Sequence, residues 1–115
     1  MILFIIFDVK EFVMGRYTLK TAKNKHKKEF SCVEKWDGES GDVFSIEIIG
    51  NNLKDTYISY DVYHDFIISI NKDKSLRYEH FDLLKLLVFI EMYDIPKKVV
   101  EKFISKITAI RQKIN

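Results

Sequence analysis

The chain has 115 residues, of which 47% are hydrophobic and 14% aromatic, and a formal net charge of +2 at pH 7. This composition excludes a disordered chain, and this length predicts one globular domain over residues 1–115 with its own core. The single cysteine cannot form an internal disulfide, and the apolar run at residues 2–7 is too short for a signal peptide or membrane span. We therefore expect a cytoplasmic protein, one that acts within a host cell if its source is a virus.

The first half of the chain predicts three strands. Residues 2–8 form an apolar run, and residues 11–17 can return after a turn, so the two predict a β-hairpin. Residues 43–49 alternate between apolar and polar side chains, which predicts a half-buried strand. Residues 18–36 fit neither period cleanly and are left open between helix and strand.

Residues 56–70 contain two competing patterns. Ile58, Tyr60 and Val62 alternate as in a strand, but apolar residues also recur at every fourth position from Ile58 to the end of the segment. The helical period explains more positions over a longer span. We therefore predict a helix over residues 56–70.

The last third of the chain predicts two packed helices. Residues 79–93 are apolar almost all round, which is typical of a helix in the middle of a packed domain. Pro96 cannot sit inside that helix but suits the first turn of the next one, an amphipathic helix over residues 96–113. The predicted fold class is α+β, a small three-stranded sheet with a helical cluster.

The order of these elements resembles the BTB/POZ domain, the fold shared with adaptor subunits of cullin-based ubiquitin ligases. Residues 10–19 are similar to the second strand and first helix of that family, residues 41–49 to its third strand, and residues 57–70 to the helix that follows. The best local match runs from the leucines at 83–87 through Tyr93-Asp94-Ile95-Pro96 to Ile104 and resembles the closing helix pair. The composition suits the divergent versions found in large DNA viruses.

The resemblance implies a noncatalytic protein–protein interaction module with a BTB/POZ-like fold. Such a module self-associates as a homodimer or docks as an adaptor onto a cullin-type scaffold. Carried over by position, the family's scaffold contacts fall on six residues: Tyr57, Tyr60, Asp61, His64, Tyr93 and Asp94.

No group of residues has the spacing of a catalytic or cofactor site. The three histidines, His26, His64 and His80, do not combine with Cys32 at any standard zinc spacing. No catalytic motif surrounds Cys32, and the chain has no glycine-rich phosphate loop. We expect no enzyme activity, no metal and no cofactor.

Charge is unevenly distributed along the chain. Residues 16–36 carry seven Lys and Arg against two Glu, a net charge of +5, and residues 96–115 also carry +5. Such runs are usually solvated surface. The alternative is a small viral or mobile-element accessory or inhibitor protein that binds nucleic acid through the basic segment 20–28. Its candidate contacts are Lys20, Lys23, Lys25, Lys27 and Lys28.

Overall fold

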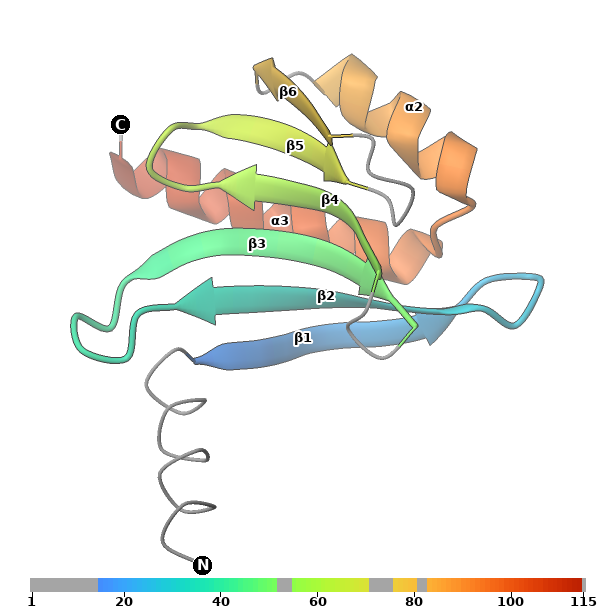
Figure 1. The fold of residues 1–115 in the computed structure, drawn as a ribbon, viewed down its shortest axis with the longest axis horizontal. Helices are drawn as coiled ribbons and strands as arrows, with labels where there is room; N and C mark the ends of the chain where they lie inside the picture. Colours follow the sequence, from blue (N-terminus) through green and yellow to red (C-terminus); the bar gives the residue numbers. More distant parts are fainter. Residues whose placement is uncertain (1–14, 52–54, 71–75, 81–82, 115) are drawn as a thin grey trace, which may run out of the picture.

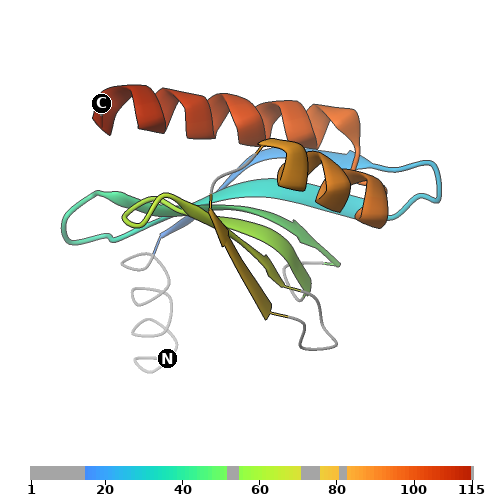
Figure 2. The same cartoon turned by 90° about the horizontal axis from the view of Figure 1, so that it is seen from above.

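The computed structural model describes residues 15–51, 55–70, 76–80 and 83–114, which form one antiparallel sheet and two helices (Figure 1). Within these residues, six strands follow one another across the sheet in chain order, each paired with the next. Both helices lie on the same face of the sheet (Figure 2). The strands are β1 (Arg16–Lys23), β2 (Glu29–Trp36), β3 (Val43–Gly50), β4 (Asp55–Asp61), β5 (Phe66–Ile70) and β6 (Leu76–His80), and the helices are α2 (Leu83–Tyr93) and α3 (Lys97–Ile114).

The hydrophobic core lies between α3 and the sheet. The buried side of α3 carries Val99, Phe103 and Ile107 at spacings of four residues, so these side chains form one row along the helix. The sheet contributes alternate residues of its strands, because side chains two positions apart share a face. Its buried members include Phe30, Cys32, Ile46, Ile48, Ile58, Tyr60 and Ile67. Burial of each large apolar side chain contributes about 1.5–3 kcal/mol.

Two elements predicted from the sequence are confirmed. The alternating segment 43–49 is β3, and the amphipathic segment 96–113 is α3. Of the predicted helix over 79–93, Leu83–Tyr93 form α2 and residues 79 and 80 belong to β6 instead, while residues 81 and 82 lie outside the described residues. The predicted strand 2–8 lies outside the described residues, and of the predicted strand 11–17 only Arg16 and Tyr17 are described as strand.

The predicted three-stranded sheet with a helical cluster is wrong. Its largest error is the helix over residues 56–70, which is the antiparallel hairpin β4–β5. Asp65 ends the turn between the two strands in the left-handed conformation, with φ of 52°. The turn contains no Gly, Pro or Asn that would mark it in the sequence. The apolar residues of β4 and β5 therefore resemble one continuous helical stripe in the sequence. In the structure, pairing of β4 with β3 holds the segment in the strand conformation.

Residues 18–36, left open by the sequence, form the hairpin β1–β2. The side-chain Oδ1 of Asn24 accepts the backbone N–H groups of His26 and Lys28, at 2.9 and 3.0 Å, and Lys27 adopts a φ of 62°. These bonds close the turn locally, as an Asx-type turn does. The lysine-rich stretch is therefore a hairpin tip and not the exposed side of a helix.

Neither described helix is both long and apolar enough to cross a lipid bilayer.

A polar clasp connects the β4–β5 turn to the C-terminal part of α3. The hydroxyl of Tyr60 donates to Asp65 Oδ1, and Nε of Arg111 lies 3.2 Å from the same oxygen. The ring of Tyr60 is fully buried, and this burial, together with the hydrogen bond to Asp65, raises the pKa of the tyrosine. The clasp fixes the far end of α3 over the sheet.

Replacing Asp65 by Ala should destabilise the protein by about 2 kcal/mol, because the buried hydroxyl of Tyr60 loses its acceptor and Ala disfavours a positive φ. Asp65→Asn keeps an acceptor oxygen and tolerates that conformation, so it should cost about 1 kcal/mol or less. Urea denaturation of the two variants measures the difference. Equal losses of stability would show that the hydrogen bond is not what matters at this position.

Candidate functional site

The described residues contain no group of three His, Cys, Asp or Glu that could hold a metal ion. His26 lies in the β1–β2 turn, where its Nε2 is 3.9 Å from Asp94 Oδ2. His64 lies in the β4–β5 turn, where its Nδ1 is 3.1 Å from Asp61 Oδ1. Cys32 lies in the core beneath α3. The two histidines lie in turns at opposite ends of the strands and Cys32 is buried between them, so the three do not form a shared site.

The thiol of Cys32 is buried and stays protonated at neutral pH. Burial raises its pKa from 9.0 to about 12, against the opposing influence of the nearby Lys102 and Lys106. A thiol must lose its proton to act as a nucleophile or a metal ligand, so Cys32 is unreactive at neutral pH. It fills space in the core as a small apolar side chain does.

The six residues that the BTB/POZ resemblance assigned to partner contacts do not share a surface. Tyr57 is buried, and its ring centroid is 4.9 Å from that of Tyr93. Tyr60 is fully buried in the core. Asp61 ends β4 and His64 lies in the turn that follows it, whereas Tyr93 ends α2 and Asp94 lies in the turn between α2 and α3. The mapping depended on a helix at residues 56–70, which the hairpin β4–β5 replaces.

The lysines of the basic segment 20–28 differ in exposure. The side chains of Lys20, Lys23, Lys25 and Lys27 are exposed. Lys28 is half-buried, and its Nζ lies 4.7 Å from the centre of the Tyr57 ring, within cation–π range.

The tip of the β1–β2 hairpin docks on the turn before α3. Asn24 Nδ2 donates to the backbone carbonyl of Asp94 at 3.1 Å. The hairpin is therefore held beside the N-terminal end of α3, where Lys97 and Lys98 begin the helix. This contact brings two basic segments together that are about 70 residues apart in the sequence.

A wide, shallow cleft of about 630 Å³, open to solvent over most of its extent, lies beside β1 and the N-terminal half of α3. It is lined by Leu19, Lys20, Lys98, Glu101, Lys102 and Ser105. The sequence singled out Lys20 but not its two companions on α3. A helix face is visible in the sequence, but the strand that it faces is not, so only the fold brings these three lysines together.

Helix α2 presents a row of large apolar side chains to solvent. Their exposed fractions range from 48% to 73%, although Leu86 on the opposite side of the same helix is fully buried. The sequence predicted a helix buried all round. The structure buries one side only, and the exposed residues are Leu83, Leu84, Leu87, Val88 and Met92.

A buried ion pair occupies the sheet face opposite α3. Lys35 Nζ lies 3.0 Å from Glu47 Oε1, and the hydroxyl of Ser59 donates to Glu47 Oε2 at 3.1 Å. The Glu47 residue is 7% exposed, so its charge depends on these two neighbours. Glu47 Oε1 has the charge of Lys35 beside it but accepts no hydrogen bond from a described residue, and it is buried within the sheet, so the pair presents no exposed group to a ligand.

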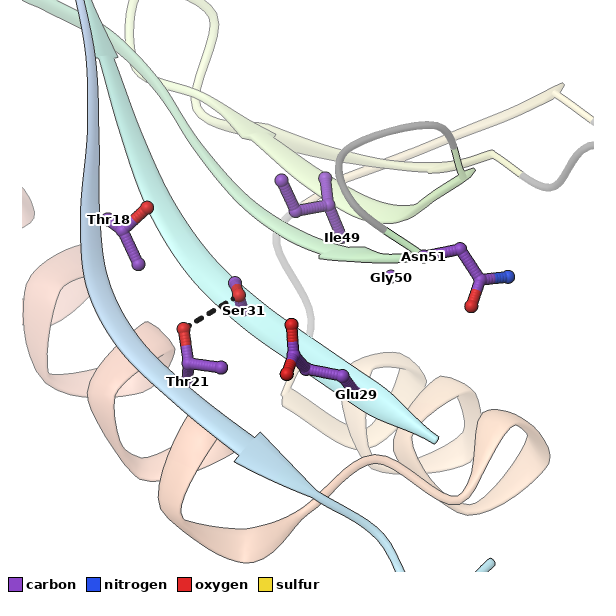
Figure 3. A pocket seen from close by; sticks show the side chains of 7 residues that line it. All are labelled: Thr18, Thr21, Glu29, Ser31, Ile49, Gly50 and Asn51. Carbon is purple, nitrogen blue, oxygen red and sulfur yellow. Dashed lines mark hydrogen bonds between the residues drawn. The ribbon is translucent and has the colours of Figure 1, made fainter. Parts of the chain in front are cut away.

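Figure 3 shows a small polar hollow near the same face, with α3 behind the sheet. Its volume is about 250 Å³, and Glu29 is its one charged side chain. Thr21 and Ser31 at its centre bond to each other at 2.8 Å. The hollow therefore offers a single carboxylate and no basic group, which is too little to define a substrate.

No protein-family model, no curated protein and no solved structure matches this chain. Two surfaces therefore remain as candidates on their geometry alone, the apolar face of α2 and the basic cleft between β1 and α3.

Replacing Lys35 by Met should destabilise the protein by about 3–5 kcal/mol at pH 7, because it leaves the buried carboxylate of Glu47 without its counter-charge. The double variant Lys35→Met/Glu47→Gln removes both charges and should recover more than half of that loss. Chemical denaturation of the three proteins measures the effect. No recovery in the double variant would contradict the charge explanation.

The thiol of Cys32 should add a pH dependence above pH 9. A protonated thiol is favoured in the folded state, so its contribution is complete below its ordinary pKa of 9.0 and declines as the pH rises toward 12. The free energy of unfolding should fall more steeply in the wild type than in Cys32→Ala, by at most about 1.4 kcal/mol per pH unit. Parallel pH profiles for the two proteins would rule out this linkage.

Proposed function

We propose that the protein is a noncatalytic protein-interaction module that self-associates through the apolar face of α2. The observation that carries the proposal is the exposure of Leu83, Leu84, Leu87, Val88 and Met92 on one 11-residue helix. Single exposed apolar residues are ordinary on protein surfaces, but a contiguous row is typical of an interaction site. These positions form the rows 83–87 and 84–88–92 at helical i,i+4 spacing, so the side chains are neighbours.

A second copy of the chain is the partner that this face fits best. In a two-fold symmetric contact each residue of the face meets the same set on the partner, so like charges would oppose one another. Among the described side chains of α2, Glu91 is the one charged group; it follows Leu83 and Leu87 at i,i+4 spacing and lies at the C-terminal end of the face, beyond Leu87 and Val88. The basic surface of α3 could not pair with itself in this way. An apolar helix face is self-complementary without any matching charge.

Docking of the same face onto a different protein would make the module an adaptor. A cullin-type scaffold is not part of the proposal, because that partner depended on a fold that the six-stranded sheet replaces. We further propose that the protein acts inside a cell, where an unpaired thiol such as Cys32 stays reduced.

Size-exclusion chromatography with light scattering across a concentration series tests self-association. The wild type should form a dimer, and the double variant Leu87→Glu/Val88→Glu should dissociate at least about 100-fold more readily, because two central apolar contacts become charged. Thr108→Glu adds a negative charge to an exposed position of α3 and should leave the dimer unchanged.

Thermal unfolding of the same proteins shows which surface the substitutions affect. A double variant that is monomeric but keeps a cooperative transition supports an interface between copies. A wild type that is monomeric at every concentration overturns self-association. A double variant that is monomeric and unfolded would show that this face is covered within one chain, and Met92→Glu at the end of the row then provides the milder comparison.

A further inference from the structure

The basic residues of α3 fall into two sets. Three are paired with carboxylates: Lys97 with Glu101 at 3.8 Å, Lys106 with Glu34 at 3.0 Å and Arg111 with Asp65 at 3.2 Å. The other three, Lys98, Lys102 and Lys113, have no carboxylate of the described residues within ion-pairing distance. Lys98 and Lys102 are four residues apart and therefore project from one side of the helix.

That side of α3 faces the cleft beside β1. Figure 2 shows β1 running beneath the N-terminal half of α3, and Lys20 of β1 lines the cleft together with Lys98 and Lys102. Lys20 also has no ion-pair partner among the residues that the structure describes. The one acidic side chain of the cleft, Glu101, is near Lys97. Three like charges along a cleft create a positive potential that attracts an anion.

An exposed aromatic ring lies near the three lysines of the cleft. Tyr17 is 63% exposed, and in the register of the sheet it lies opposite Glu34 on β2. Residues directly opposite in a sheet share a face, and Glu34 reaches α3 through Lys106. Tyr17 therefore lies on the α3 side of β1, three residues before Lys20. The three lysines of the cleft and the Tyr17 ring, which can stack on a base, therefore lie on the same side of the sheet.

We propose that the cleft between β1 and α3 binds single-stranded nucleic acid, with phosphates on Lys20, Lys98 and Lys102 and a base stacked on Tyr17. Proteins that bind single strands combine a positively charged groove with exposed aromatic rings in this way. This proposal goes beyond self-association through α2 and does not depend on it.

The edge of the sheet argues against an acidic peptide as the occupant. Among the described strands β1, like β6, has a single neighbour, so it is an edge to which an extended peptide could add. The register of β1 shifts between Thr18 and Lys20, and lysines occupy the strand at positions 20 and 23. Bulges and lysines are the devices by which edge strands resist the addition of another strand. The features that this edge offers to a ligand are therefore its lysines and the exposed ring of Tyr17.

Fluorescence anisotropy with a labelled 15-nucleotide dT strand, and with the matching U strand, tests the proposal at 50 and 200 mM NaCl. Three phosphate contacts on a single strand predict a wild-type affinity that falls roughly 20-fold between these salt concentrations. Lys98→Glu should weaken binding about tenfold and lower the salt dependence. Tyr17→Ala should weaken binding at least fivefold without changing the salt dependence.

Lys113→Glu is the matched control, since it makes the same charge change at an exposed position about 22 Å from Lys98 along α3. Salt screens charges at that separation, so this variant should bind within about twofold of the wild type. The monomeric Leu87→Glu/Val88→Glu variant should also bind one strand per chain with unchanged affinity.

Three results would overturn the proposal. The first is the absence of binding to either strand at 50 mM NaCl. The second is equal weakening by Lys98→Glu and Lys113→Glu, which would indicate diffuse attraction without a site. The third is binding of a 15-residue polyglutamate as tightly as the dT strand, with no effect of Tyr17→Ala, which would assign the cleft to an acidic protein.

Discussion

The packing of α3 across the sheet is the constraint on which the rest of the molecule depends. One row of apolar side chains along the helix, Val99, Phe103 and Ile107, covers the apolar residues that alternate along the central strands. Because the side-chain period of a strand is two, this contact decides which residues of every strand are buried. Removing the helix would expose the largest part of the core, so sheet and helix are one cooperative unit.

The orientation of α3 also decides what its polar residues do. Lys106 and Arg111 reach carboxylates of β2 and of the β4–β5 turn, and so connect the helix to the sheet at two points. Lys98 and Lys102 lie in the same i,i+4 row as Lys106 but nearer the start of the helix, beside the edge strand, where no described carboxylate is within ion-pairing distance of them. The basic cleft is therefore a consequence of core packing and not of the lysine content of the chain.

Helix α2 buries fewer of its side chains in the core than α3 does. It ends at Tyr93, where Asp94 adopts a φ of 53° and Pro96 starts the next helix, so its direction is set by a short turn. The buried Leu86 and Ile95 anchor it, and its opposite side remains exposed and apolar. The two proposed surfaces belong to different elements, the outer side of α2 and the β1 side of α3. A dimer formed through α2 would thus keep both basic clefts accessible.

The sequence by itself determined those elements in which the spacing of apolar residues fits only a helix or only a strand. The alternation of residues 43–49 and the four-residue stripe of 96–113 correctly predicted β3 and α3, and Pro96 correctly separated the two helices. Residues 56–70 satisfy both periods, so only pairing with β3 decides that they are strands, in a turn closed by a left-handed Asp65. The lysines of β1 were visible as a basic run, but their neighbours on α3 were not. A site composed of residues about 80 positions apart exists only when the sheet and the helix are packed together, because sequence periodicity reports which face an element buries and not which element it meets.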